Sequence, residues 1–222
     1  MVRDNAKTKG AGNDRGNRSG ATSGKNLDGF VEIMADLIAE AKIEGLVTGT
    51  TKTQVNLPGY LRPSKDWDLV LSRQGELLAA IEFKSHVGPS FGNNFNNRAE
   101  EAMGSSLDLR TAVQHGVYGD GHRMPFLGWC ILVEDAPKSR AETGIASLIR
   151  TFKPMEEFRG ESYLGRYDIF CQRLMEQSFY TAASVIASPE LEGLESGDYS
   201  DMSEATSFEA FIRRFWEHLA TV

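Results

Sequence analysis

Between residues 26 and 41, apolar side chains recur every three or four positions and acidic side chains fall between them. This period is typical of an amphipathic helix that packs one face on a core. The apolar stripe consists of Phe30, Ile33, Met34, Leu37, Ile38 and Ala41. Glu32 lies on the opposite side of the predicted helix, which favours a solvated position for its carboxylate.

Two stretches have the pattern of β-strands. The segment DLVLSRQGELLAAIEFK, residues 68–84, predicts two strands that meet at a turn around Gly75. The segment FLGWCILV, residues 126–133, is almost continuously apolar. Such a run is expected of a central strand that is covered on both faces.

The other periodic segments predict helices. Residues 99–115 have helical spacing after an irregular stretch rich in Gly and Asn. A stripe over residues 163–174 predicts another helix, which residues 179–187 continue or restart. Thr206 and Glu209 have capping-box spacing ahead of a last amphipathic helix. Together these elements predict an α/β fold with a central mixed sheet flanked by helices and a helical C-terminal half.

The composition is ordinary for one globular domain, with 222 residues, 41% of them hydrophobic and 25% charged. No apolar run reaches the roughly 18 residues of a membrane span. The first residues have no apolar secretory core, so we expect a cytoplasmic protein without membrane contact. Cys130 and Cys171 lie in apolar or helical segments, which favours reduced core thiols over a disulfide or a metal site.

The net charge of -7 is distributed unevenly along the chain. Residues 1–25 contain six Lys or Arg and two Asp, which gives +4 and leaves -11 for the remainder. This opening segment is rich in Gly, Asn and Ser, a composition typical of disorder. We interpret residues 1–25 as a flexible basic arm and residues 26–222 as one folded domain. Contact between the arm and nucleic acid is the alternative to a plain solvated tail.

The second predicted strand ends with two charged side chains on one face. Successive strand residues point to opposite faces, so Glu82 and Lys84 lie on the same side. A charge in an internal strand is costly unless it is paired or bound to metal. Asp68, at the start of the first strand, is the candidate that completes this group.

The turn decides whether Asp68 reaches Glu82. A two-residue loop at positions 74–75 alone would set Asp68 opposite Ile81, on the wrong face. A three-residue loop at positions 74–76, or a bulge, would set Asp68 opposite Glu82. We expect the second arrangement, because two carboxylates about 5 Å apart ionise together only when a cation neutralises them. Mg²⁺ suits such a pair, since it prefers carboxylate oxygens and is often completed by substrate phosphate.

The spacing of Asp68, Glu82 and Lys84 resembles the PD-(D/E)XK nuclease motif, which by itself is a weak signal. The longer runs LPGYLRPSKDWDLVL and AAIEFKSHVGPSFGNNFNNRAEEA closely resemble the XhoI family of type II restriction endonucleases. The resemblance extends from about Lys25 to about Phe215 and is most specific over residues 57–101. Trp67 stands where the motif has Pro, a change that affects backbone stiffness but not ligand chemistry.

The resemblance implies a restriction-endonuclease-like core and a cytoplasmic, homodimeric, Mg²⁺-dependent enzyme. Such an enzyme cuts double-stranded DNA at a short palindrome, in this family CTCGAG, beside a cognate DNA methyltransferase. Asp68 and Glu82 would hold Mg²⁺. Lys84 would orient the attacking water and stabilise the transition state, with general base as the lesser alternative. His86 shares their face of the strand; we leave open whether it acts directly, supports the site or lies at the surface. Nucleases of this fold often draw a further carboxylate from the first helix, for which Glu32 is the candidate, but its position opposite the apolar stripe favours a solvated side chain.

The segment GPSFGNNFNNR, residues 88–98, has more amide side chains than a turn requires. We predict an irregular loop in which some side chains read base edges in the major groove, because Asn pairs with adenine and Arg with guanine. The candidates are Asn93, Asn94, Asn96, Asn97 and Arg98, with Arg62 and Lys65 on phosphates. The alternative is a turn that serves only as scaffold.

Two other functions compete with site-specific cleavage. A nuclease of the same fold would act on junctions, ends or single strands. A DNA-binding module without catalysis would show no metal-dependent cleavage, and the intact acidic pair and lysine argue against it.

Overall fold

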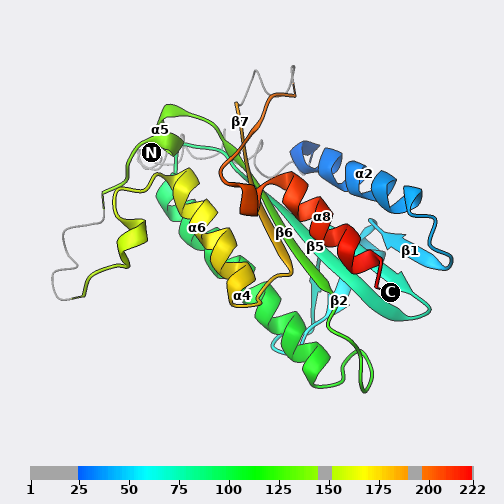
Figure 1. Cartoon of the computed structure of the whole chain (residues 1–222). Helices are drawn as coiled ribbons and strands as arrows, with labels where there is room; N and C mark the ends of the chain where they lie inside the picture. The colour runs from blue at the N-terminus through cyan, green and yellow to red at the C-terminus, as the bar shows by residue number, and fades with distance from the viewer. Residues whose placement is uncertain (1–24, 145–151, 190–196, 222) are drawn as a thin grey trace, which may run out of the picture.

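The structure, a computed structural model, describes residues 25–144, 152–189 and 197–221. Most of the predicted basic arm, residues 1–24, lies outside the described residues. A six-stranded mixed sheet forms the centre of the molecule, in the order β1-β4-β5-β6-β7-β8 (Figure 1). Its strands are β1 (Leu46–Gly49), β4 (Leu69–Arg73), β5 (Glu76–His86), β6 (Phe126–Glu134), β7 (Ala182–Ser188) and β8 (Ser200–Asp201).

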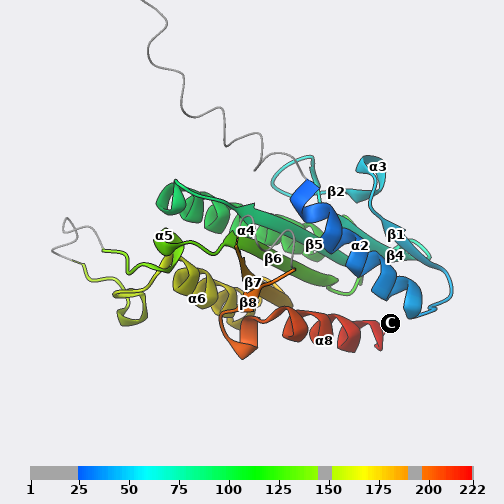
Figure 2. The same cartoon turned by 90° about the horizontal axis from the view of Figure 1, so that it is seen from above.

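A small second sheet and four long helices surround this centre. The second sheet is a hairpin of β2 (Asn56–Pro58) and β3 (Ser64–Asp66). Helices α4 (Phe91–Gln114) and α6 (Tyr163–Glu176) cover one face of the main sheet, and α2 (Lys25–Glu40) and α8 (Phe208–Leu219) cover the other (Figures 1 and 2). Short helices are α3 (Lys52–Val55), α5 (Pro137–Arg140) and the 3-10 turns Glu156–Phe158 and Glu204–Thr206. No described helix has the length and apolar character needed to cross a membrane.

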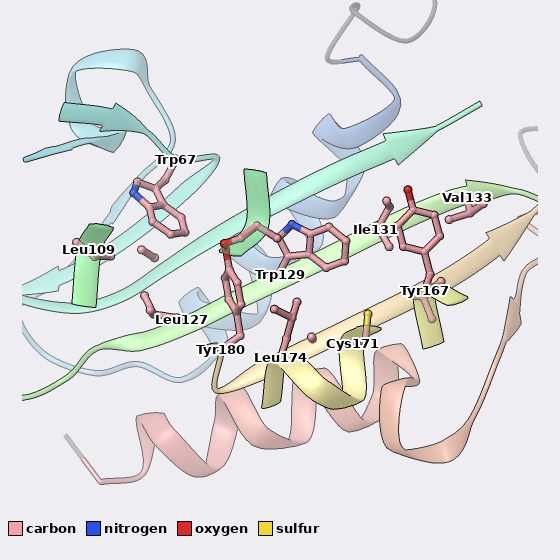
Figure 3. Packing of buried hydrophobic residues seen from close by; sticks show 14 of the residues in the cluster. Trp67, Leu109, Leu127, Trp129, Ile131, Val133, Tyr167, Cys171, Leu174 and Tyr180 are labelled. Atoms are coloured by element: carbon pink, nitrogen blue, oxygen red, sulfur yellow. The ribbon is translucent and has the colours of Figure 1, made fainter. Parts of the chain in front are cut away.

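The fold confirms the predicted mixed sheet between helices. Strand β6 pairs in parallel with β5 and β7, so it is central as its apolar run predicts. Its alternate residues enter two separate cores. Trp129, Ile131 and Val133 pack toward α4 and α6, where Figure 3 shows them beside residues of α6. Cys130 belongs to the core under α2 and α8.

Both cysteines are buried free thiols, as predicted. Burial raises the pKa of the Cys130 thiol to about 12. Cys171 lies in the opposite core, on α6. Neither thiol is therefore available as a thiolate near neutral pH.

Three predicted elements are wrong in detail. The segment of residues 179–187 does not continue a helix, because Ala182–Ser188 forms β7, a strand buried on both faces. Helix α4 begins at Phe91 rather than near Ala99, so most of the predicted loop of residues 88–98 is helical. The last helix is capped by Ser207, whose hydroxyl accepts the Ala210 N–H, and not by Thr206.

Candidate active site

The hairpin of β4 and β5 brings Asp68 and Glu82 to the same face of the sheet. Leu69 pairs with Ile81, the last pair of the two strands, and Asp68 and Glu82 are the residues that flank this pair; the Asp68 N–H donates to the Ile81 carbonyl at 3.1 Å. The sequence predicts an odd-numbered loop or a bulge in this hairpin, and the structure contains the bulge. The three-residue loop is wrong, because Arg73 pairs with Glu76 across a two-residue turn.

A β-bulge supplies the extra residue that the turn does not. Gln74 and Gly75 both have positive φ, 53° and 87°, as a tight hairpin turn of type I′ requires. The register then shifts between Leu71 and Ser72, which leaves Leu78 as the additional residue on β5. The shift moves every later residue of β5 by one position relative to β4. Without it, Asp68 would lie beside Ile81.

Asp68 is partly buried and is fixed by the adjacent strand. Its Oδ2 accepts the Phe83 N–H at 2.7 Å. Burial raises the pKa of Asp68 above its usual value, although the Phe83 hydrogen bond and the positive charge of Lys84 act in the opposite direction. The other carboxylate, Glu82, adds to the increase. A bound cation would therefore favour the ionised form of Asp68.

Glu82 is a buried carboxylate held by two ammonium groups. Its Oε1 accepts hydrogen bonds from Lys84 Nζ at 2.6 Å and from Lys65 Nζ at 2.7 Å. Burial alone would raise the pKa of Glu82, but the charges of the two lysines outweigh it and the pKa lies below its usual value. Glu82 is thus ionised near neutral pH. Its Oε2 is buried and has no hydrogen-bond partner among the described residues.

Lys65 is the member of this group that the sequence did not indicate. The prediction placed it with Arg62 as a phosphate contact, whereas in the structure its ammonium lies on Glu82. It comes from β3, outside the central sheet, and no local pattern links it to a residue 17 positions later. Only the fold of the β2–β3 hairpin shows the contact.

A hollow of about 510 Å³ opens beside Asp68. Its lining includes Glu32 of α2, whose side chain is exposed, and Asp66 of β3. Asp66 Oδ1 accepts a hydrogen bond from Asn56 at 2.6 Å. Within the described ranges, no group of three or more His, Cys, Asp or Glu side chains is arranged to hold a metal ion. The carboxylate pair therefore offers a partial ligand set, of the kind that waters and phosphate oxygens complete around Mg²⁺.

His86 contacts the core rather than the carboxylates. Its Nδ1 lies 2.8 Å from the Tyr167 hydroxyl, and its ring lies 4.8 Å from the ring of Phe91. The side chain is 1% exposed, so the alternative of a surface residue is wrong. Burial lowers the pKa of His86 to about 4, and the nearby Arg98 charge acts in the same direction. The imidazole is neutral near pH 7.

Comparison with known proteins decides the family. The family model for restriction endonuclease XhoI matches residues 6–201. The chain is 43% identical over 183 residues to the type II restriction enzyme XhoI of Xanthomonas vasicola, covering 79% of this chain and 70% of that protein. It is 36% identical over 216 residues to the type II restriction enzyme BstVI of Geobacillus stearothermophilus, covering 95% and 94%. No solved structure matches the chain.

The chain belongs to the XhoI family of restriction endonucleases. A further relative, the type II restriction enzyme AbrI of Azospirillum brasilense, is 50% identical over 122 residues, 54% of each chain. The expected family and fold class are thereby confirmed, and the protein is a type II restriction endonuclease whose substrate is DNA.

The amide-rich segment of this family member forms the first two turns of α4. Phe91 and Phe95 explain why Asn-rich sequence is helical here, because their rings pack on Tyr163 and Tyr167 of α6. Such packing overrides the weak helix propensity of Asn. The helix presents the exposed side chains of Asn93, Asn96 and Asn97 on one surface, while Asn94 and Arg98 are half-buried. Arg98 also pairs with Glu101 at 2.7 Å.

Arg62 lies at the tip of the β2–β3 hairpin and is fixed by α4. Its Nε donates to Asp108 Oδ2 at 2.8 Å, and the N–H groups of Tyr60 and Leu61 donate to Asp108 Oδ1 at 2.8 and 2.6 Å. These bonds keep the pKa of Asp108 below its usual value in spite of its burial. Gly59 is required beside this carboxylate, since a Cβ there would lie within van der Waals overlap of Asp108.

Proposed function

We propose that the protein cleaves double-stranded DNA at the palindrome CTCGAG in a Mg²⁺-dependent reaction, with Asp68, Glu82 and Lys84 as its catalytic residues. The observation that carries this proposal is the register of β4 and β5, which sets both carboxylates and the Lys84 ammonium on one face. The endonuclease unit would be the single domain of residues 26–222.

The side chains present suit a hard divalent cation. Asp68 and Glu82 are oxygen ligands, and the buried Oε2 of Glu82 lacks a partner among the described residues. We infer that these two carboxylates hold Mg²⁺. When bound, the ion supplies a water of lowered pKa and stabilises charge on the phosphate oxygens.

The chain's own groups have separate tasks in this reaction. The Phe83 N–H holds the Asp68 carboxylate in orientation at the sheet. Lys84 is 23% exposed at its side chain, so its ammonium can contact both Glu82 and a phosphate at the surface. We assign Lys84 the roles of orienting the attacking water and stabilising negative charge in the transition state. Glu82 in turn restricts the position of that ammonium.

Sequence readout is assigned to the exposed surface at the start of α4. The side chains of Asn93, Asn96 and Asn97 are exposed there. An Asn amide pairs with adenine N6 and N7 in the major groove, which suits a site with adenine in each half. Asn94 and Arg98 are half-buried and offer less of their side chains to DNA, and Arg98 also pairs with Glu101. Arg62, 42% exposed, would face a phosphate while it keeps Asp108.

The two-fold symmetry of the proposed DNA recognition sequence implies the oligomeric state of the protein. A palindrome is matched by two copies related by a two-fold axis, so we infer a homodimer. Cleavage of unmodified DNA in the host cytoplasm also implies a DNA methyltransferase that protects the same sequence.

Digestion of a plasmid of known sequence tests the function. Incubation with Mg²⁺ should give discrete fragments whose sequenced ends map to one palindrome, while chelator or Asp68→Asn should give intact plasmid. Ends distributed without a common sequence, or cuts confined to junctions or single strands, would contradict site-specific cleavage. Retained binding of the duplex without any metal-dependent cutting in the wild type would favour a binding module instead.

A further inference from the structure

Two ammonium groups share one oxygen of the buried carboxylate. Lys65 Nζ and Lys84 Nζ lie 2.7 and 2.6 Å from the same atom, Glu82 Oε1. The side chains of the lysines are 14% and 23% exposed, so both charges are largely removed from water. A desolvated carboxylate needs such compensation. A divalent cation at Glu82 would provide it instead and would repel the nearby ammonium groups.

The two lysines come from different sheets and have different contacts. Lys84 lies on β5, which pairs with β4 on one side and β6 on the other. Lys65 lies on β3, which among the described strands pairs with β2 alone, in a separate two-stranded sheet. The Lys65 ammonium has other contacts besides Glu82, namely the Asp66 carbonyl at 3.0 Å and the face of the Trp67 ring at 4.7 Å. Because these contacts remain available when the contact with Glu82 is lost, Lys65 is the ammonium that can leave that carboxylate.

We propose that Lys65 is a positioning residue of the cleavage site, which pairs with Glu82 when no metal is bound and leaves that carboxylate when a divalent ion binds. The inference rests on the proposed metal site at Asp68 and Glu82. It makes the β2–β3 hairpin part of the active site, because Lys65, whose ammonium leaves Glu82, lies on β3. Asp108 fixes the hairpin tip on α4, so the exchange is a movement of the Lys65 side chain and not of the whole hairpin.

Calorimetric titration of the full chain with Mn²⁺, without DNA, tests the exchange. Lys65→Met removes the competing charge, so it should bind Mn²⁺ about tenfold more tightly than the wild type, equivalent to about 1.4 kcal/mol. Lys65→Arg keeps a cation and should bind within about twofold of the wild type. Lys153→Met, at an exposed position, is the matched control for the loss of one lysine and should bind as the wild type does. Wild-type or weaker binding by folded Lys65→Met overturns the exchange.

Trp67 provides a second measurement, which does not depend on the folding of a Lys65 variant. The ammonium lies over the buried indole, so its movement away from Glu82 changes its position relative to the ring and should shift the Trp67 emission as Mn²⁺ saturates the wild type. The shift should be absent in Trp67→Phe. Emission that stays constant while Mn²⁺ binds overturns the exchange. Mn²⁺ binding that is unchanged in Asp68→Asn overturns the metal site itself, which separates failure of the proposed function from failure of this inference.

Discussion

The buried His86 makes the stability of the fold depend on pH in a direction that can be calculated. Its imidazole is neutral in the folded protein, with a pKa of about 4 against 6.5 for an unburied histidine. Between these values the unfolded chain binds a proton that the folded chain does not. The contribution of His86 to the free energy of unfolding is therefore fully present above pH 6.5 and decreases as the pH falls toward 4.

The size of this effect follows from the two pKa values. Lowering the pH from about 7.5 to about 4.5 should reduce the free energy of unfolding by about 2.5 kcal/mol through His86 alone. That is a large part of the roughly 5–15 kcal/mol by which domains are stable. The cause is specific to the site of the ring, which is 1% exposed between Tyr167 and Phe91.

Urea unfolding at a series of pH values measures the effect. His86→Asn keeps a polar group near the Tyr167 hydroxyl but cannot bind a proton, so its unfolding free energy should lose the corresponding part of the pH dependence. His115→Asn, at an exposed histidine, is the control and should keep the wild-type dependence. Equal pH dependence in His86→Asn and the wild type would refute a neutral buried imidazole, whatever the absolute stability of the variant.

Three further predictions concern the candidate active site, the Asp108 anchor and the proposed DNA-reading surface at the start of α4. Asp68→Asn and Lys84→Ala should each lower cleavage by about 100-fold or more while the cognate duplex still binds in Ca²⁺; a parallel loss of binding would assign them to recognition. Asp108→Asn should lower the unfolding free energy by about 2 kcal/mol, because Oδ2 no longer accepts the bond from Arg62 and the two backbone N–H bonds to Oδ1 lose their charge assistance, and unchanged urea unfolding would contradict that anchor. Asn97→Ala should relax discrimination at one base pair by about 1–3 kcal/mol, measured on the cognate duplex and every one-base variant; equal weakening on all of them would make this surface scaffold.

The relation of Asp68 to Glu82 could be predicted from the sequence because chemistry restricts the register. Strand alternation and the spacing of the charged residues leave only arrangements with one extra residue in the hairpin. The choice between a longer loop and a bulge could not be made. Gln74 in positive φ is unfavourable for a residue other than Gly, and only the complete pairing of β4 with β5 reveals that the turn accepts it.

The helical start of α4 was hidden by local composition. Gly, Pro and Asn at positions 88–97 favour turns and irregular backbone, and each lowers helix propensity. What outweighs them is the burial of Phe91 against α6, a contact with a residue 72 positions later in the chain, Tyr163. The same limit explains β7, whose apolar residues have no period that separates a buried strand from a buried helix.

The β2–β3 hairpin links the proposed DNA-reading surface of α4 to the proposed catalytic residues. Asp108 of α4 holds the backbone of the hairpin tip, and the same hairpin carries Lys65 to Glu82. Lys65 is only three residues before Asp68, so a displacement of the hairpin would move both charged residues. The side chains of α4 that we propose to contact DNA and the carboxylate that we propose to bind metal would therefore be joined through Asp108 and Lys65. Removal of the Asp108 anchor should affect cleavage more than duplex binding, because the position of Lys65 depends on it.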